Sequence, residues 1–387
     1  MALASRSRRL HPVDMYGGDA PEGAGQRSLS QRTTGTAGQQ RLRLPRRALL
    51  AAPALTWPAA AQPAAFAAAW QGFRERFLTP EGRIVDTGNE NISHSEGQGW
   101  GLLFAAAAGD RPAFDSLLRF TRGALRRPAD ALHAWKWNPS TRPHVADPNN
   151  ATDGDLYILW GLARGAARWH DRSLVEEARE IARDLLRLTM REVAGRRILL
   201  PGAQGFEHPD RVVVNPSYAV FPAWRVLRVL LPDPAWVRLE MDHLVLLRDA
   251  RFGERQLPAD WVDLPRNGGR LAPARQWPPR FSFDAVRVPL LLAWIGQPHH
   301  PAVRSAVAFW SNPGPSFIPA WVDLQDGTLA PFPASAGVLA IHRLLLALQR
   351  GERRFPPVSP PAEEDYYSAA LRLLVLLAAV DLGLAIG

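Results

Sequence analysis

Three short segments of the sequence combine a carboxylic acid with residues that could position it for proton transfer. In the first, residues 93–101, Glu96 follows Ser95, and glycine stands at positions 97, 99 and 101. Ser95 is of a residue type that caps helices, and an acid in a first helical turn is favoured by the helix dipole. Glycine at alternate positions costs helix stability. We therefore expect a helix that begins at Glu96 and whose backbone is approached closely by something bulky.

The second segment, residues 147–155, gathers carboxylates and amides just before a helical pattern begins. A calcium-binding EF-hand loop would need an acid or amide where Ala151 stands and glycine where Thr152 stands, so calcium is not expected. Thr152 or Asp153 could cap the following helix. A cap alone does not account for the whole group, which follows the tryptophans Trp135 and Trp137 in the chain.

The third segment, residues 281–287, places Asp284 and Arg287 three positions apart, so the two side chains share one face of a helix. Ser282 is the expected cap of that helix. An arginine beside a carboxylate favours its ionised form. We interpret Arg287 as the group that orients Asp284 and keeps it ionised, and a surface ion pair is the alternative.

These segments resemble, in this order, the motifs of glycoside hydrolase family 8. The resemblance spans about residues 64–384 and rests on six runs: Ser-Glu-Gly-Gln-Gly-Trp-Gly at 95–101, Ala-Trp-Lys-Trp at 134–137, Asn-Asn-Ala-Thr-Asp-Gly-Asp-Leu at 149–156, Asn-Pro-Ser-Tyr at 215–218, Asp-Trp-Val at 260–262 and Ser-Phe-Asp-Ala-Val-Arg at 282–287. Within the family, the chain is most similar to the endoglucanases that accompany bacterial cellulose synthases. Each run alone is a weak indication, and their conserved order makes the resemblance specific.

The resemblance implies an all-α fold, an (α/α)6 barrel of about twelve helices with long loops that form an open cleft. It implies an inverting mechanism with Glu96 as the general acid, Asp284 as the general base and Asp153 as a sugar-binding carboxylate. The other positions expected to contact substrate are Trp100, Trp135, Trp137, Asn150, Tyr218 and Arg287. Phe283 and Trp100 stand where the family usually carries tyrosine.

Inverting hydrolysis needs a protonated carboxyl on one side of the scissile bond and a carboxylate that activates water on the other, roughly 6.5–9.5 Å apart. A nearby negative charge such as Asp153 would raise the pKa of Glu96, as the acid role requires. The apolar faces of glucan rings stack on tryptophan, and their hydroxyl groups need polar partners. The expected activity is an endo-β-1,4-glucanase (cellulase) acting on cellulose, linked to bacterial cellulose synthesis, with no cofactor and no metal.

The elements that must position these residues are mostly helices. Apolar residues recur at helical spacing in eleven segments, residues 64–77, 96–108, 112–125, 153–169, 173–188, 216–230, 234–250, 283–295, 301–310, 334–348 and 365–384. Residues 198–200 and 211–214 are expected to be short strands or extended loops. Three long loops, 126–152, 196–216 and 251–282, carry tryptophans, which favours functional loops over disorder. The apolar tail, residues 371–386, is expected to be a buried helix because it is short and holds two charges.

The first 61 residues are expected to be a disordered extension followed by a signal peptide, ahead of the catalytic domain, which we place at 62–387. Arg46 and Arg47 stand before an apolar run and then Ala59-Ala60-Ala61, which is typical of a signal peptide, either general or twin-arginine. A first packed helix is the alternative. We expect an exported protein, periplasmic or secreted, with no membrane span in the mature chain.

Composition argues against other classes. Residues 1–60 hold nine arginines against three acids, so most of the net charge of +9 lies before the expected domain. We therefore do not expect nucleic-acid binding, because no basic stripe with interleaved aromatics is present. Cysteine is absent, which excludes disulfides and thiolate sites. The histidines at 94, 133 and 144 match no helix-borne pair of metal ligands.

Two other functions remain open from the sequence. The chain could be a glucan-binding accessory of a cellulose-export machine without catalysis, although its acids are intact. It could also be a hydrolase of the same fold that acts on chitosan or xylan, because the loops determine the shape of the sugar-binding subsites.

Overall fold

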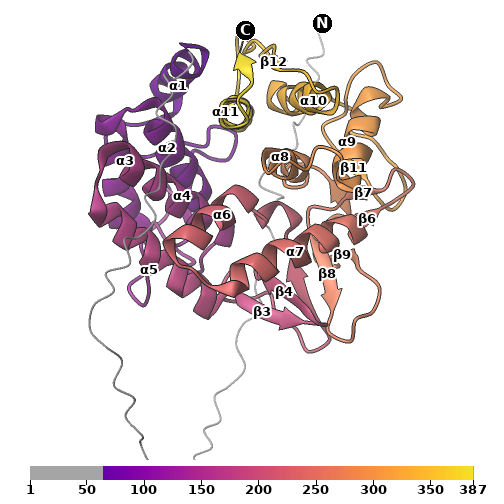
Figure 1. Ribbon diagram of the computed structural model, residues 1–387, viewed down its shortest axis with the longest axis horizontal. Helices are drawn as coiled ribbons and strands as arrows, with labels where there is room; N and C mark the ends of the chain where they lie inside the picture. Colours follow the sequence, from indigo (N-terminus) through magenta and orange to yellow (C-terminus); the bar gives the residue numbers. More distant parts are fainter. Residues whose placement is uncertain (1–63, 387) are drawn as a thin grey trace, which may run out of the picture.

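The computed structural model describes residues 64–386, and Figure 1 shows this part as a ring of helices with small sheets at one side. The expected extension and signal peptide, residues 1–61, lie outside the described residues. The eleven expected helices are all present in the described part. Their bounds are α1 (Ala64–Phe77), α2 (Ser95–Ala108), α3 (Arg111–Phe120), α4 (Thr152–Trp169), α5 (Arg172–Leu188), α6 (Phe221–Leu230), α7 (Pro234–Asp249), α8 (Arg287–Trp294), α9 (Pro301–Ser311), α10 (Ala336–Gln349) and α11 (Tyr366–Asp381).

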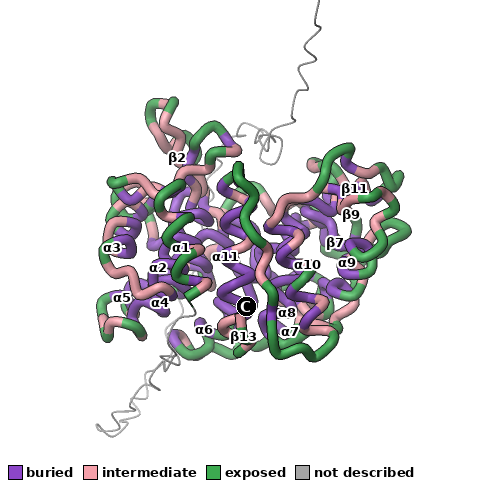
Figure 2. The backbone as a smooth tube through the Cα atoms, turned by 90° about the horizontal axis from the view of Figure 1, so that it is seen from above, coloured by how far each residue is buried: buried purple, intermediate pink, exposed green. Residues whose placement is uncertain are grey.

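The helices fall into an inner and an outer set. Helices α2, α4, α6, α8 and α11 form a continuous inner ring, because each contacts the next and α11 contacts α2. Nearly every residue of α2, α4 and α8 is buried, as expected for helices that are apolar on all sides. Helices such as α3 and α5 bury a single face against this ring. Figure 2 shows the same division, with buried backbone inside and exposed backbone at the rim. This is the helical barrel that the sequence predicted.

The glycines of α2 mark the place where α4 crosses it. A Cβ atom on Gly99 would lie 2.6 Å from the Cβ of Tyr157 and 2.7 Å from the backbone nitrogen of Ile158, both on α4. At Gly161 on α4, a Cβ would lie 2.8 Å from the Cβ of Leu102 on α2. Only glycine permits backbones to approach this closely. The expectation of a close approach is confirmed, and the approaching group is a helix whose first turn carries Asp153.

The strands are short and lie in the long loops. The main sheet is antiparallel, in the order β5 (Arg211–Val214), β8 (Val262–Pro265) and β9 (Ala272–Pro273), and the hairpin of β3 (Met190–Val193) and β4 (Arg196–Leu199) lies apart from it. Both expected strands are thus present. Two-residue pairs complete the set: β1 (Ser93–His94) with β2 (Lys136–Trp137), β6 (Arg251–Phe252) with β7 (Leu257–Pro258), β10 (Arg280–Phe281) with β11 (Val322–Asp323), and β12 (Arg354–Phe355) with β13 (Ala385–Ile386).

The apolar tail of the chain is a buried inner helix, as predicted. Its charged residues form ion pairs inside the fold: Asp381 binds Arg164 of α4 at 2.9 Å, and Arg372 binds Glu364 at 2.8 Å. Among residues 64–386, none of the helices combines the length and the apolar character that crossing a membrane requires.

Candidate active site

Glu96 lies in the first turn of α2, and His94 caps that helix. The backbone of His94 is extended through its pairing with β2, and its Nδ1 accepts the N–H of Gly97 at 3.0 Å. The prediction that Ser95 caps the helix was wrong. The helix begins one residue earlier than expected, so Ser95 lies inside it, where its buried hydroxyl makes no hydrogen bond in the described structure. Pairing with β2 also brings the loop that carries Trp135 and Trp137 beside the acid.

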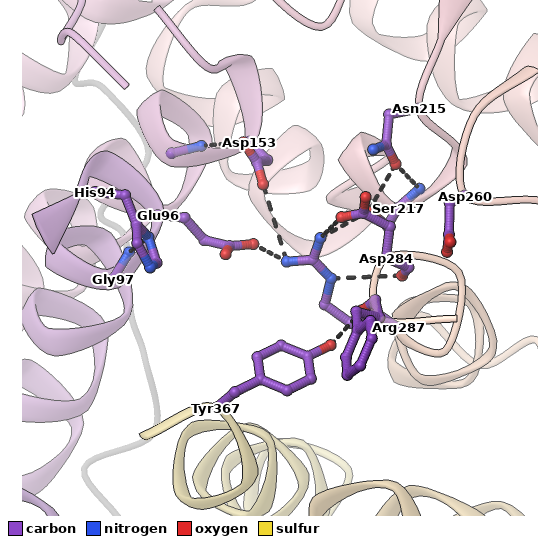
Figure 3. Close-up of polar contacts among 12 residues, drawn as sticks. His94, Glu96, Gly97, Asp153, Asn215, Ser217, Asp260, Asp284, Arg287 and Tyr367 are labelled. Carbon is purple, nitrogen blue, oxygen red and sulfur yellow. Dashed lines mark hydrogen bonds and ion pairs between the residues drawn. The ribbon is translucent and has the colours of Figure 1, made fainter. Parts of the chain in front are cut away.

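Asp153 lies in the first turn of α4, directly across the close crossing with α2. Neither Thr152 nor Asp153 caps the helix, contrary to one of our interpretations, because the cap position is Ala151. The Thr152 hydroxyl instead donates to the carbonyl of Leu200 at 2.7 Å. The Asp153 side chain is almost completely buried, and its carboxylate points toward the Arg287 guanidinium (Figure 3).

Asp284 lies in a turn that precedes α8. The prediction of a helix from residue 283 capped by Ser282 was wrong in its first turn, because α8 begins at Arg287. Asp284 and Arg287 are nevertheless in contact, at 2.6 Å between Oδ1 and Nη2. Both side chains are buried, which excludes the alternative of a surface ion pair.

One guanidinium connects all three carboxylates (Figure 3). Arg287 contacts Glu96 through Nη1, the same nitrogen lies 3.9 Å from Asp153, and Nη2 binds both Asp284 and the hydroxyl of Ser217, the latter at 2.9 Å. The carboxyl groups of Glu96 and Asp284 therefore lie on different sides of a single planar cation. Three acids facing one base leave an excess of negative charge in a buried site.

Burial and neighbouring negative charges raise the pKa of two of these acids. Burial raises the pKa of Asp153 to about 7. Burial, followed by the negative charges of Asp260 and Asp153, raises the pKa of Asp284 well above its usual range. The ion pair between Arg287 and Asp284 is present as predicted, and the pKa of Asp284 is nevertheless raised, with burial as the largest cause. The effect predicted for Asp153 on the pKa of Glu96 stays a prediction.

Replacing Asp153 by asparagine is expected to stabilise the fold while it removes activity. The pKa of Asp153 is higher in the folded protein than in the unfolded chain, so the folded state binds the proton more tightly. The free energy of unfolding therefore falls as pH rises from about 4 to beyond 7. Asp153→Asn removes this loss, and a gain of about 1–2 kcal/mol is expected at about pH 8, as is common when a functional site is relieved.

Thermal melts of both proteins at about pH 8 and pH 4 measure this difference, which should shrink at the lower pH because wild-type Asp153 is then protonated. Glu254→Gln, at an exposed acid, is the control and should change neither melt. A lower melting temperature of Asp153→Asn at the higher pH would contradict the interpretation.

Two of the predicted substrate contacts, Trp100 and Asn150, are buried, and their contacts with sugar stay predictions. Trp100 has no exposed area and lies in the core against Tyr157 and Tyr366, with the Arg287 guanidinium 5.8 Å from its ring centre. It packs behind the site. Asn150 is also buried because its amide fastens two loops. It donates to Asp155 at 2.9 Å and accepts the N–H of Ala203 at 2.8 Å.

The other aromatic residues predicted to bind sugar make different contacts within the protein. Trp135 is partly exposed, and its Nε1 donates to Asp147 at 2.8 Å. The ring of Trp137 is stacked against His144 and also lies 5.0 Å from the Arg83 guanidinium carbon, so protein groups already occupy its faces. Tyr218 packs against Trp261 near the base. Lys136 Nζ lies 4.7 Å from the centre of the Trp135 ring. Sugar contacts by these residues stay predictions.

Three residues beside Asp284 were not predicted to belong to the site. Asn215 and Trp261 favour its ionised form, and Ser217 binds Arg287. Asn215 follows β5 and accepts both the N–H and the hydroxyl of Ser217, at 2.9 and 2.8 Å. All three lie within motifs on which the family resemblance rests, so the sequence already marked these segments. Their position next to the base was not, because it depends on how the sheet packs on the barrel.

The three histidines considered as metal ligands make separate contacts. His94 caps α2, His133 binds the buried Asp155 at 2.9 Å, and His144 stacks on Trp137. Within residues 64–386, no group of three or more potential ligand side chains is arranged to hold a metal ion.

The helical barrel holds two buried carboxyl groups with an arginine between them, which is typical of an enzyme that uses acid–base chemistry. Comparison with known proteins specifies the class. Residues 42–381 match the model of glycosyl hydrolases family 8. The chain is 40% identical to an endoglucanase of Cellulomonas uda, over 76% of this chain and 82% of that protein. It is also 40% identical to a probable endoglucanase of Novacetimonas hansenii, over 82% and 92% of the two chains.

Solved structures agree. The endo-β-1,4-glucanase of Acetobacter xylinum superposes with a TM-score of 0.75 at 38% identity, over 82% of this chain and 98% of that one. An endoglucanase of Klebsiella pneumoniae gives 0.76 at 40% identity, over 81% and 99%. The chain belongs to glycoside hydrolase family 8, and it is a glycoside hydrolase.

Proposed function

We propose that this protein is an inverting endo-β-1,4-glucanase that cleaves internal bonds of cellulose. The observation that carries the proposal is the placement of Glu96 and Asp284 on different sides of the Arg287 guanidinium, with Asp153 beside them. An acid and a base that flank a common space are what inversion requires, since water must enter opposite the leaving group. The relatives called endoglucanases support the choice of polymer.

In the proposed reaction, Glu96 donates its proton to the glycosidic oxygen as the bond from that oxygen to the anomeric carbon breaks. A water molecule held by Asp284 attacks the anomeric carbon from the opposite face, and its proton passes to the Asp284 carboxylate. The product carries the inverted anomeric configuration. The raised pKa of Asp284 makes it a better proton acceptor once ionised.

Arg287 has a second effect in this scheme. It contacts Glu96 while no substrate is bound and so pairs the acid with a cation. A sugar ring that enters between Glu96 and Asp284 displaces water and separates Glu96 from the cation, and both changes favour the protonated acid.

Depolymerisation of carboxymethylcellulose tests the proposed function. An endo-acting enzyme lowers the viscosity of the solution early, when few reducing ends have been released, and this is the expected result. Chitosan and xylan assayed in parallel should be cleaved more slowly. Binding to soluble glucan without cleavage would favour the accessory role, and faster cleavage of chitosan or xylan would assign another polymer.

We also propose that the protein is exported and acts beside a cellulose synthase. Arg46 and Arg47 followed by an apolar run support export, and the resemblance of the motifs to endoglucanases that accompany bacterial cellulose synthases supports the second part. Fractionation of cells that express the full chain, followed by amino-terminal sequencing of the mature protein, tests export. Recovery of uncleaved protein from the cytoplasm would contradict it.

A further inference from the structure

Asp260 binds the segment that carries the general base. Its Oδ1 accepts the N–H of Ser282 at 3.1 Å and the N–H of Ala285 at 2.7 Å, and its Oδ2 accepts the hydroxyl of Ser282. The carboxylate is buried, with 8% of the residue exposed. Figure 3 shows it beside Asp284 but outside the contacts of Arg287. The reaction scheme above gives Asp260 no part.

The turn that holds Asp284 depends on these hydrogen bonds. It precedes α8, whose cap position, Val286, makes no side-chain hydrogen bond to the helix. Backbone N–H groups at a helix start need acceptors from outside the helix. Asp260 supplies an acceptor on both sides of Asp284, at Ser282 and at Ala285, and so fixes the backbone from which the base projects.

Asp260 is itself held by the sheet. Its N–H donates to the carbonyl of Arg280 at 2.8 Å, and it stands two residues before β8, whose Val262 pairs with Val214 of β5. The strand pair therefore carries Asp260 on one strand and leads into Asn215 on the other. In this way a small sheet within a helical barrel contributes the surroundings of the base.

The charges around Asp284 come from several elements. Arg287 of α8, Asp153 of α4 and Asp260 face it, Tyr367 of α11 lies nearby with its hydroxyl on the carbonyl of Phe283, and Glu96 of α2 lies across Arg287. Burial raises the pKa of Asp260 itself to about 6. At neutral pH Asp260 is therefore an anion, and its charge is the largest influence after burial on the pKa of Asp284.

We propose that Asp260 is a positioning residue for the general base: it fixes the turn on both sides of Asp284 and places a negative charge beside it. The inference rests on the proposed function of Asp284. Asp260 contributes to the base in two ways, through geometry and through charge, and two substitutions can distinguish them.

The test compares Asp260→Ala with Asp260→Asn in the purified full chain, using pH profiles of kcat/KM on a soluble cello-oligosaccharide. Asp260→Ala removes the acceptors, so kcat should fall about 100-fold with KM little changed, as expected when a catalytic group is displaced by about an ångström. Asp260→Asn keeps an acceptor for both N–H groups and loses the charge. It should recover most of kcat, and the acidic limb of kcat/KM should move about one unit to lower pH because the pKa of Asp284 falls.

Asp263→Asn is the matched control. Asp263 is equally buried and lies on β8, but its carboxylate pairs with Arg211 and Arg275, at 3.0 and 3.2 Å. This variant should keep the wild-type acidic limb.

An unchanged acidic limb in Asp260→Asn would overturn the proposal, even if Asp260→Ala failed to fold, and so would wild-type kcat in Asp260→Ala. Absence of any cleavage by the wild-type protein would instead contradict the proposed function, so the two failures are distinguishable.

Discussion

Glu96→Gln is expected to lower the rate of release of reducing ends from carboxymethylcellulose by about 10²–10⁴-fold, the usual contribution of a general acid. Glutamine has the size of glutamate but cannot donate a proton to the leaving oxygen. Asp284→Asn should cause a loss of the same order because asparagine cannot accept the proton of the attacking water. Reducing-end assays with the purified variants measure both effects.

The identity of the leaving group separates the two roles. A dinitrophenyl cello-oligosaccharide releases a phenolate that needs no protonation, so Glu96→Gln should lose much less activity on it than on carboxymethylcellulose. Asp284→Asn should lose activity equally on both substrates. Glu177→Gln is the matched control, since Glu177 is a buried glutamate that pairs with Arg122 on the outer side of the barrel, and it should stay active. If Glu96→Gln lost as much on the activated substrate as on the polymer, its assignment as the acid would be wrong.

Arg287→Met is expected to cause the largest loss of stability, about 3–5 kcal/mol near neutral pH, the usual cost of leaving buried charges without their partner. The guanidinium is the cation that Glu96, Asp153 and Asp284 share. Without it, Asp153 and Asp284, whose pKa values burial already raises, lose the cation that they share. The folded variant then binds protons more tightly than the unfolded chain, so its deficit is present at neutral pH and declines as pH falls toward about 4.

Urea unfolding of Arg287→Met and wild type at about pH 8 and pH 5 measures this pH dependence. Arg287→Lys keeps the charge but lacks the planar fork, so its loss should be smaller. Arg164→Met is the control because the buried Arg164 pairs with the carboxylate of Asp381, and its deficit should depend less on pH. A deficit of Arg287→Met that is equal at both pH values would show that lost packing, and not charge, is its cause.

The helices could be predicted from the sequence because their apolar residues recur at helical spacing and prolines or small polar residues mark their beginnings. The caps of the catalytic helices were predicted less well. Ser95 and Ser282 are suitable capping residues, yet His94 caps α2, and Asp260 accepts the N–H of Ser282 in the turn before α8. In both cases a contact distant in the sequence decides: β2 sets the backbone of His94, and the sheet presents Asp260 to the turn.

The sequence predicted which residues form the candidate site better than it predicted how they are arranged. The family motifs identified Glu96, Asp153, Asp284 and Arg287, and the structure brings them together. They did not show that Trp100 is buried behind the site or that Asn150 fastens loops. Residue type and spacing cannot distinguish a side chain that faces sugar from one that supports its neighbours, because the choice depends on packing between segments distant in the chain.

The replacement of tyrosine by Phe283 also has a structural setting. The carbonyl of Phe283 accepts the hydroxyl of Tyr367, a residue of α11, and the two rings lie 6.0 Å apart. A tyrosine hydroxyl is therefore present at the turn that carries the base, although it comes from another helix.

The measurement that tests the central claim most directly is proton NMR of the anomeric configuration during hydrolysis of a soluble cello-oligosaccharide by the wild-type protein. If Glu96 acts as the acid and Asp284 activates water on the opposite face, the first product resonances belong to the α-anomer, and the β-anomer follows only by mutarotation. Initial accumulation of the β-anomer would contradict the assignment, because it requires two successive displacements at the same carbon.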